Sequence, residues 1–299
     1  MDLLSDAITA VRIGRPTSNR LSAGDDWCYR FARYEGAGFH ALLRGSGWLV
    51  PESGAPVPLG AGDVVLVPHG SPHTLSSRPD AAGAVPFEAA VPEPDGRTEF
   101  LCGKYRLAQA HRHPVLTSLP EVVHVPARVG VGSRLRSAMD LLGAELSAAE
   151  PGSATVVAGL LDLLLVYLIR AWLADNPGTG WPQALSDPPI AAALEAVHAN
   201  PEAPWRIEDL AARVGLSRAT LARRFTASTG RPPMAYLTWW RLTKAARLLR
   251  ETTLPLPSVA AKVGYGSPFA FSHAFKREFG VAPGVYRAGD DQASDVDLR

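Results

Sequence analysis

The residues best suited to bind a polyanion lie in a short segment of the C-terminal third, where arginines stand beside small side chains. Arg218 and Arg223 lie five positions apart, and Ala219 and Ala222 fall between them. Small side chains let a helix approach base edges in a DNA groove, while guanidinium groups reach guanine or phosphate oxygens. The types and spacing of these residues favour contact with a nucleic acid.

A second segment, fifty residues further on, carries a related set. Phe269 offers an apolar surface to a thymine methyl group, and Ser272 and His273 offer polar groups. Lys276 and Arg277 are better suited to the phosphate backbone, where contacts add affinity without sequence information. The candidate DNA-binding residues of the two segments together are Ser217, Arg218, Ala219, Ala222, Arg223, Arg224, Ser267, Phe269, Ser272, His273, Lys276 and Arg277.

Two histidines and two cysteines form a second chemically capable set, in the N-terminal half. A closed metal site needs about four ligands, and His40 and His73 supply two. Cys28 and Cys102 are too few and too far apart for a disulfide framework. A nearby cation, such as Lys104 beside Cys102, favours a reactive thiolate that responds to oxidants. The alternatives are histidines satisfied within the fold and cysteines that serve as small buried apolar side chains.

An internal repeat supplies the elements that position the two basic segments. Residues 211–215, Ala-Ala-Arg-Val-Gly, match residues 260–264, Ala-Ala-Lys-Val-Gly, and the match continues from Ser217 and Ser267 with one residue added near Gly266. Because turns tolerate insertions, the added residue marks a turn. Each copy is expected to be a helix, a glycine-containing turn and a second helix capped by its serine.

The second helix of each copy is expected to bury an apolar pair four residues apart. Leu221 and Phe225 form this pair in the first copy, and Phe271 and Phe275 form it in the second. Between the copies, residues 234–251 have one continuous amphipathic pattern. A helix of that length would fix the spacing and angle of the two helical pairs.

The charge distribution agrees with this interpretation. Residues 187–289 carry 14 Lys and Arg against 7 Asp and Glu, although the formal net charge of the 299-residue chain is only +1. A basic segment beside a mildly acidic one is typical of a polyanion-binding module joined to another domain. A solvated basic face, or a protein-interaction module, is the alternative, and a steep loss of affinity with salt would distinguish DNA binding.

The C-terminal third resembles the DNA-binding domain of the AraC/XylS family of transcription regulators. The motifs that carry the resemblance are IEDLAARVGLSRATLARRF at 207–225, GRPPMAYLTWWRLTKAARLLRET at 230–252 and VAAKVGYGSPFAFSHAFKREFGVAPGVYR at 259–287. The resemblance implies two recognition helices in successive major grooves, about one helical turn or ~34 Å apart. The base-facing positions that it implies are Ala219, Ala222, Arg223, Phe269, Ser272 and His273.

From Trp27 to His73 the pattern changes to short apolar runs between glycine and proline turns, which predicts a small barrel or jelly roll. The segments FHALLRGSGWLV, LGAGDVVLVPHGSPHTL, FLCGKYRL and HPVLTSLPEVVHV resemble the cupin-type sensor domain of one branch of the same family. Some members of that branch are similar to thiol-based oxidant sensors. The resemblance therefore implies a signal that is an oxidant, sensed at Cys28 or Cys102, or a small apolar or carbonyl ligand.

The sequence has only some of the residues that bind a metal ion in cupins. A metal-binding cupin usually has a His-x-His pair and a Glu in its first motif and a His in its second. Here Leu42 stands two residues after His40, so His40 and His73 alone correspond. A divalent metal at these two residues would occupy a weak or shared site. His111 and His113 offer another pair, in a predicted loop.

Two helices are predicted after the barrel, at 132–148 and 153–174. The second is too apolar for a solvated helix, and it resembles the dimerisation helices of this family; packing within its own chain is the alternative. Asp162 and Arg170 interrupt its apolar run, which disfavours a membrane span. We expect an α+β multidomain protein with a cupin-like domain at 1–128, a helical dimerisation segment at 129–178, a linker at 179–189, a double helix-turn-helix domain at 190–289 and an acidic tail at 290–299.

These features predict a cytoplasmic, homodimeric regulator that binds double-stranded DNA, with RNA polymerase as a further candidate partner and with no enzymatic activity. The acidic start of the chain is unlike a signal peptide. A cupin-type metalloenzyme with an accessory helical domain is the main rival, and the incomplete metal set argues against it. A DNA-alkylation-repair methyltransferase would need a cluster of cysteines that this chain lacks. No residue identifies the operator, the signal or the direction of regulation.

Overall fold

A computed structural model of the chain describes residues 3–11, 15–106, 113–127, 133–148, 150–176, 178 and 180–294. The chain divides into two compact units. The β unit comprises residues 12–109 and 116–176, and the helical unit comprises residues 1–11, 110–115 and 177–299.

The β unit is a sandwich of two five-stranded sheets, with strand orders β1-β9-β3-β6-β10 and β5-β4-β7-β2-β8. The predicted jelly-roll-like architecture is thereby confirmed. Apolar side chains from both sheets, among them Leu49 and Phe100, form its core. The strands are β1 Thr17–Ala23, β2 Cys28–Phe31, β3 Gly36–Arg44, β4 Ser46–Pro51, β5 Val57–Gly60, β6 Val64–Val67, β7 His73–Ser76, β8 Val85–Pro86, β9 Thr98–Arg106 and β10 Val123–Val125, with a 3₁₀ helix η1 at Phe87–Ala89.

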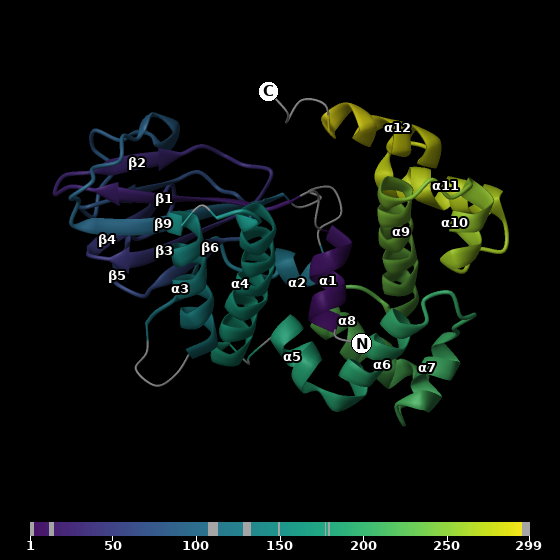
Figure 1. Ribbon diagram of the computed structural model, residues 1–299. Helices are drawn as coiled ribbons and strands as arrows, with labels where there is room; N and C mark the ends of the chain where they lie inside the picture. The colour runs from purple at the N-terminus through teal and green to yellow at the C-terminus, as the bar shows by residue number, and fades with distance from the viewer. Residues whose placement is uncertain are drawn as a thin grey trace. The chain divides into compact units, whose positions relative to one another are not determined.

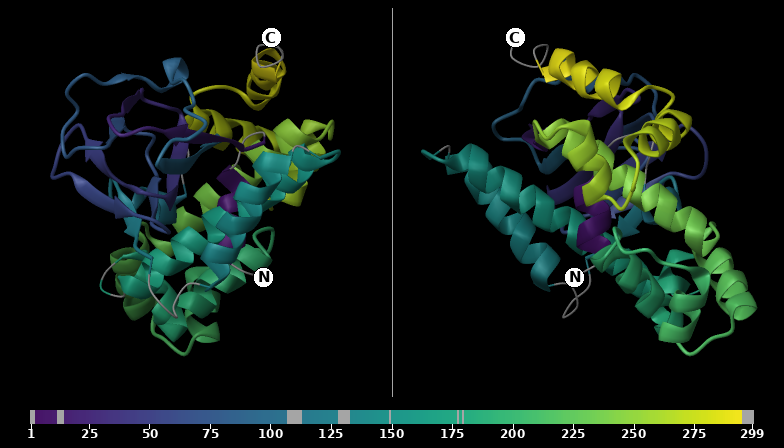
Figure 2. Two further views of the ribbon diagram at one scale, coloured as in Figure 1. Left: turned by 60° about the vertical axis from the view of Figure 1, so that its left-hand side comes forward. Right: turned by 90° about the vertical axis from the view of Figure 1, so that its right-hand side faces the viewer.

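Two long helices, α3 (Ser133–Ala148) and α4 (Ser153–Asp175), lie side by side in the β unit (Figures 1 and 2). The inner face of α4 buries Leu161, Leu164, Leu165 and Leu168, whereas Val156 and Leu163 are exposed. By length and composition alone, α4 is apolar enough to cross a membrane. Helix α4 therefore packs one face inside the β unit and leaves exposed apolar side chains on another.

The helical unit is built around one long helix, α9 (Pro233–Glu251). A group of shorter helices surrounds each end of α9, with α10 to α12 at the upper end in Figure 1 and α6 to α8 at the lower end. The shorter helices are α1 Leu3–Val11, α5 Trp181–Ser186, α6 Pro188–Ala199, α7 Ile207–Arg213, α8 Arg218–Thr229, α10 Leu256–Lys262, α11 Pro268–Phe279 and α12 Pro283–Ser294. A further short helix, α2 (Pro114–Thr117), begins directly after His113.

The helical unit extends beyond the double helix-turn-helix bounds expected at 190–289. It includes α1, the segment from His113 to Val115, and α5, which lies within the expected linker. Helix α12 continues to Ser294, into the expected acidic tail, and residues 295–299 lie outside the described residues. Helix α1 and the segment from His113 to Val115 are distant in sequence from the rest of this unit, so a division along the chain does not reveal them.

Candidate nucleic-acid interface and sensor pocket

The first helical pair, α7 and α8, has the predicted local structure. Gly215 adopts φ +67° at the turn, and the Ser217 hydroxyl accepts a hydrogen bond from the Thr220 N–H at 3.2 Å, which caps α8. Leu221 and Phe225 are fully buried, so the predicted inward pair is confirmed. Because this face of α8 is fixed in the core, its opposite face is turned outward.

The second pair, α10 and α11, repeats this construction. Gly264 adopts φ +82°, and the Ser267 hydroxyl accepts from the Ala270 N–H at 3.5 Å. Pro268 occupies the first turn of α11, where a missing N–H costs no hydrogen bond. Phe271 and Phe275 are fully buried against apolar side chains of α9 and α10. The two copies therefore present equivalent outer faces.

The outer faces carry the predicted DNA-binding residues. Phe269 is 89% exposed. Exposure of an apolar ring to water is unfavourable, so this position favours a partner that covers it. On α11, Ser272 is partly exposed and Ser267 is partly exposed at its cap. The exposed members of the predicted set are Ser217, Arg218, Ala219 and Arg223 of the first copy and Phe269, His273, Lys276 and Arg277 of the second, and Ala222 and Arg224 are partly exposed.

Two of the arginines on α8 already have acidic neighbours. Arg218 lies 3.2 Å from Glu208 in an exposed pair, which solvent screens. Arg224 donates from Nη2 to both carboxylate oxygens of Asp187 at 2.6 Å, and Asp187 also caps α6. Arg223 has neither of these contacts and is exposed. Of the predicted contacts on α8, Arg223 is thus better placed than Arg224 to reach a base without a rearrangement.

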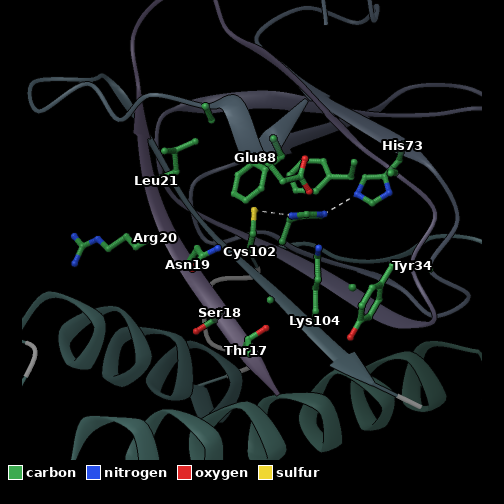
Figure 3. A pocket seen from close by; sticks show the side chains of 18 of the residues that line it. Thr17, Ser18, Asn19, Arg20, Leu21, Tyr34, His73, Glu88, Cys102 and Lys104 are labelled. Carbon is green, nitrogen blue, oxygen red and sulfur yellow. Dashed lines mark hydrogen bonds between the residues drawn. The ribbon is translucent and has the colours of Figure 1, made fainter. Parts of the chain in front are cut away.

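A cavity of about 580 Å³ lies in the β unit, against strands β1, β3 and β9 (Figure 3). Its volume suits a small organic molecule. Phe31 and Phe87 give it apolar walls, and Lys104 lies with its Nζ 5.1 Å from the ring centroid of Tyr34. The polar lining residues include Asn19, Tyr34, His40, His73, Cys102 and Lys104.

A line of hydrogen bonds joins Cys102, His40 and His73 beside this cavity (Figure 3). His73 Nδ1 lies 2.8 Å from the Ser71 carbonyl and must donate to it, so His73 Nε2 accepts. His40 Nε2 then donates to His73 Nε2 at 2.7 Å, and His40 Nδ1 accepts from the Cys102 thiol at 2.9 Å. The three residues lie on strands β3, β7 and β9, and the fold brings them together.

Burial governs the protonation of this line. It lowers the pKa of His40 well below its usual value, with His73 and Lys104 adding to the effect. It lowers the pKa of His73 as well, although the hydrogen bond to Ser71 opposes the shift. Burial raises the pKa of Cys102 well above its usual value and outweighs Lys104. The sequence suggested a thiol activated by Lys104, and the structure instead holds a protonated thiol beside a neutral imidazole.

The predicted metal site does not gain ligands from the fold. Among the described residues, no group of three or more His, Cys, Asp or Glu side chains could hold a metal ion. His40 and His73 point at each other at hydrogen-bond distance, and one of the two nitrogens carries the proton. The two imidazoles therefore do not fit a closed metal site, and we derive no step through a metal.

The other candidate residues from the sequence, Cys28, His111 and His113, are not among the described residues that line the cavity. Cys28 is a buried free cysteine on β2, paired in register with Ser76 of β7, and it does not line the cavity. Of the second histidine pair, His111 lies outside the described residues, and His113 is fully buried in the helical unit. Asn19 on β1 and Tyr34 between β2 and β3 were missed, because an isolated polar residue carries no local signal of the cavity that it faces.

The comparisons with known proteins settle the family. The family described as Cupin matches residues 2–174, and the family described as Helix-turn-helix domain matches residues 210–289. A "Putative AraC-like transcription regulator" of Streptomyces lividans is 36% identical over 96% of this chain and 98% of its own length. This chain belongs to the AraC family. It is a DNA-binding transcription regulator with an N-terminal cupin domain.

Further similarities of this AraC-family regulator cover most of the chain or about a third of it. The "RCS-specific HTH-type transcriptional activator RclR" of Escherichia coli K12 is 33% identical over 83% of each chain. Among solved structures, the DNA-binding domain of AdpA in complex with a target DNA is 36% identical over 34% of this chain and 92% of that chain, with a TM-score of 0.33. The names of the relatives are those of transcription regulators rather than enzymes.

Proposed function

We propose that this regulator inserts α8 and α11 into adjacent major grooves of DNA and that the cavity of its cupin domain receives the signal that changes this binding. The observation that carries the proposal is the matched construction of the two helices. Each buries an aromatic side chain in a core and turns basic and small side chains outward. The exposed ring of Phe269 on α11 adds an apolar surface that suits a thymine methyl group.

The outward residues divide by chemistry. Arg223 is the proposed reader of a guanine, because its guanidinium can donate twice to the O6 and N7 atoms. Ala219 and Ala222 let the α8 backbone approach the bases, and Ser272 and His273 offer polar groups on α11. Lys276 and Arg277 contact phosphates and add affinity for any sequence. The first helix has few hydrogen-bonding side chains at its base-facing positions, so DNA shape supplies part of its specificity.

An oxidant is one class of signal that the cavity supports. Cys102 lines the cavity, and His40 Nδ1 lies 2.9 Å from its sulfur, where it can receive the thiol proton as the sulfur attacks. A hydroperoxide would transfer one oxygen atom to this sulfur, which leaves a sulfenic acid and an alcohol or water. The raised pKa of Cys102 means that this reaction depends on the proton moving to His40.

A small apolar or carbonyl ligand is the second class of signal. Phe31 and Phe87 supply apolar surface, and Lys104 and Asn19 supply hydrogen-bond donors for a carbonyl oxygen. A ligand that prefers one conformation of the β unit would shift the equilibrium toward it, which is the energetic requirement for regulation. In either case the cavity, rather than a metal, is the proposed sensor.

The α3–α4 pair is the proposed dimerisation surface. Leu141 of α3 and Val156 and Leu163 of α4 are exposed apolar side chains on adjacent helices. A second copy of the chain would remove them from water. We place this homodimer in the cytoplasm, with DNA as its partner, RNA polymerase as a further candidate and no enzymatic role.

The test begins with in-vitro selection of a duplex by the reduced protein. Affinity for that duplex is then measured with and without a mild hydroperoxide in the wild type, Cys102→Ser and Cys28→Ser, together with a thiol titration. If Cys102 senses the oxidant, affinity changes in the wild type and Cys28→Ser and stays constant in Cys102→Ser. Affinity that changes while both thiols stay free would refute the thiol switch. A metal analysis and a turnover screen of the same preparation test the metalloenzyme alternative.

A further inference from the structure

Cys102 and Lys104 lie two positions apart on β9, and their side chains rise on the same side of the strand into the cavity (Figure 3). Alternate residues of a strand share a face and lie roughly 7 Å apart. A sulfur nucleophile and an ammonium group are therefore held at a fixed separation on one wall. An oxidant needs only the sulfur, and a simple carbonyl ligand needs only the ammonium group, so the pair favours a ligand that uses both.

The neighbouring strand β3 completes this wall. In the antiparallel register, His40 lies opposite Cys102 and Gly38 lies opposite Lys104. His40 Nδ1 accepts the thiol hydrogen bond at 2.9 Å, so the sulfur already has a group that can receive its proton. Gly38 lines the cavity, and a Cβ placed on it would meet only the Gly103 carbonyl oxygen, at 3.8 Å. The space opposite the ammonium group is therefore open to a ligand.

The charges of the cavity wall favour an oxygen atom that gains negative charge beside Lys104. Within the described part of the chain Lys104 has no acidic partner, and its Nζ lies over the ring of Tyr34. Arg20, the other cation of the described lining, is paired with Glu99. Glu88, the acidic residue of this lining, is exposed, so solvent screens it. Lys104 is thus the cation available to a ligand oxygen.

We propose that the cavity takes an α,β-unsaturated ketone or aldehyde and that Cys102 forms a covalent adduct with it. The carbonyl oxygen of such a ligand lies three bonds from its β-carbon, so the oxygen can accept from Lys104 while the β-carbon lies at the sulfur. The stacked rings of Phe31 and Phe87, with centroids 4.6 Å apart, supply apolar surface for the rest of the ligand. As the identity of a signal, this inference rests on the proposed function of the cavity.

The addition balances with the groups that the cavity holds. As the sulfur forms its bond to the β-carbon, the thiol proton passes to His40 Nδ1, and the electrons of the carbon–carbon double bond move to the carbonyl oxygen. The resulting enolate lies beside the ammonium group of Lys104, which stabilises its charge. Return of the proton from His40 to the α-carbon leaves a thioether and a neutral imidazole. The step needs no oxidant, no reductant and no leaving group.

Burial makes this chemistry selective. It raises the pKa of Cys102 well above its usual value, so the thiol stays protonated in the empty cavity. Reaction then requires an electrophile that is held long enough for the proton to move to His40 and for Lys104 to take up the developing charge. Cys28, which does not line the cavity, lacks this arrangement.

The first test is a labelling experiment on the reduced full-length chain in a Cys28→Ser background. The probe is 2-cyclohexen-1-one, and intact mass and peptide mapping report the adduct. We expect one adduct, on Cys102, and none when Cys102→Ser is added to this background. Saturated cyclohexanone is the control and should leave the mass unchanged. An adduct on another residue, with Cys102 unmodified, would overturn the proposal.

Lys104→Met tests the ammonium group separately from the thiol. Its labelling rates are measured with 2-cyclohexen-1-one and with allyl bromide, which alkylates a thiol without placing charge on an oxygen. We expect the ratio of the two rates to fall about tenfold or more, because only the enone loses the stabilised oxygen. Arg106→Met is the matched control, since Arg106 lies two positions further along β9 and is not among the residues that line the cavity. A ratio that is unchanged in Lys104→Met would refute the site.

His40→Gln tests the proton acceptor through the pH dependence of the enone reaction. With His40 present, the proton moves within the pair, so the rate should change little between about pH 6.5 and 8. In His40→Gln the thiol must ionise to solvent, and the rate should rise about tenfold per pH unit. The same steep rise in the parent protein would overturn the role of His40. Lys104 is exposed, so the Lys104→Met comparison stands even if His40→Gln fails to fold.

Affinity for the selected duplex, measured before and after labelling, separates this inference from the proposed function. We expect the adduct to change the affinity and Cys102→Ser to show no response to the enone. An adduct that forms on Cys102 with the expected dependence on Lys104 but leaves the affinity unchanged would refute the sensor function and support the modification site. An enone that changes the affinity equally in Cys102→Ser would refute the modification site and leave the sensor function standing.

Discussion

Arg223 and Lys276 are two cations on equivalent helices, and we assign them different parts in the proposed binding of DNA. Both side chains are exposed, and each lies on a proposed recognition helix whose inner face is fixed by a fully buried phenylalanine. A guanidinium near base edges discriminates between bases through two directed hydrogen bonds, whereas an ammonium group near phosphate adds only attraction. The difference lies in geometry, so it is measurable as a difference in specificity.

Arg223→Ala is expected to weaken specific binding by about 1–3 kcal/mol and to relax the preference at one base position. Lys276→Ala should weaken binding to specific and random DNA alike and reduce the salt dependence by about one phosphate contact. Titrations of both variants against selected and random duplexes at several salt concentrations test this pair. Equal losses on the two duplexes for both variants would show that the roles are wrongly assigned.

The buried histidines of the helical unit make its stability depend on pH. Burial lowers the pKa of His113 well below 6.5, with His198 adding to the shift. The pKa of His198 is also lowered by burial, which outweighs the opposing effect of Asp6 and is aided by Lys244. Below pH 6.5 these histidines therefore bind protons in the unfolded state but stay neutral in the folded state. Stability from these groups is full above that pH and falls as the pH decreases through it.

We expect the free energy of unfolding of this unit to fall by about 1.4 kcal/mol per pH unit for each histidine that stays neutral, between pH 6.5 and the lowered folded pKa values. Hydrogen exchange of the α9 amides, measured from pH 7.5 downward, reports this unit. His198→Gln should reduce the slope relative to the wild type. A slope that is unchanged in His198→Gln would contradict the assignment of His198 as a neutral buried group.

At the scale of elements, the two helix-turn-helix pairs were predictable because their signals are local. Capping by Ser217 and Ser267, and the burial of Phe225 and Phe271, follow from spacing within a dozen residues. His113 carries no comparable signal. Its hydrogen-bond partner Tyr236 lies more than a hundred positions away in the sequence. Nothing in the residues next to His113 predicts that partner. The cavity residues escaped prediction for the same reason.

The two turn glycines of the repeat offer a direct comparison. Gly215 and Gly264 both have positive φ, so alanine at either costs about 1–2 kcal/mol of left-handed strain. A Cβ on Gly215 would meet open space, whereas a Cβ on Gly264 would lie 2.7 Å from the backbone of Glu202. Gly264→Ala should therefore lower the free energy of unfolding by more than Gly215→Ala does. Chemical denaturation of both variants checks the order, and the reverse order would contradict the packing of the second turn.

At the scale of the whole molecule, the regulator joins a cupin sandwich to a helical unit that takes in three segments of the chain. The sequence predicts the order of the domains, because each has its own periodicity and its own motifs. It does not predict that α1 and the His113 segment belong to the helical unit, since membership of a unit depends on long-range packing. Because of that interleaving, the chain crosses between the two units at four points, after residues 11, 109, 115 and 176.

The central claim is that α8 and α11 of one chain bind neighbouring major grooves on the same face of DNA. The most direct measurement is the affinity for the selected duplex before and after five base pairs are inserted between its two half-sites, with hydroxyl-radical footprints of both. Half a helical turn moves the second half-site to the opposite face, so the affinity should fall about 100-fold and one footprint should disappear. An unchanged affinity with both footprints retained would contradict the account.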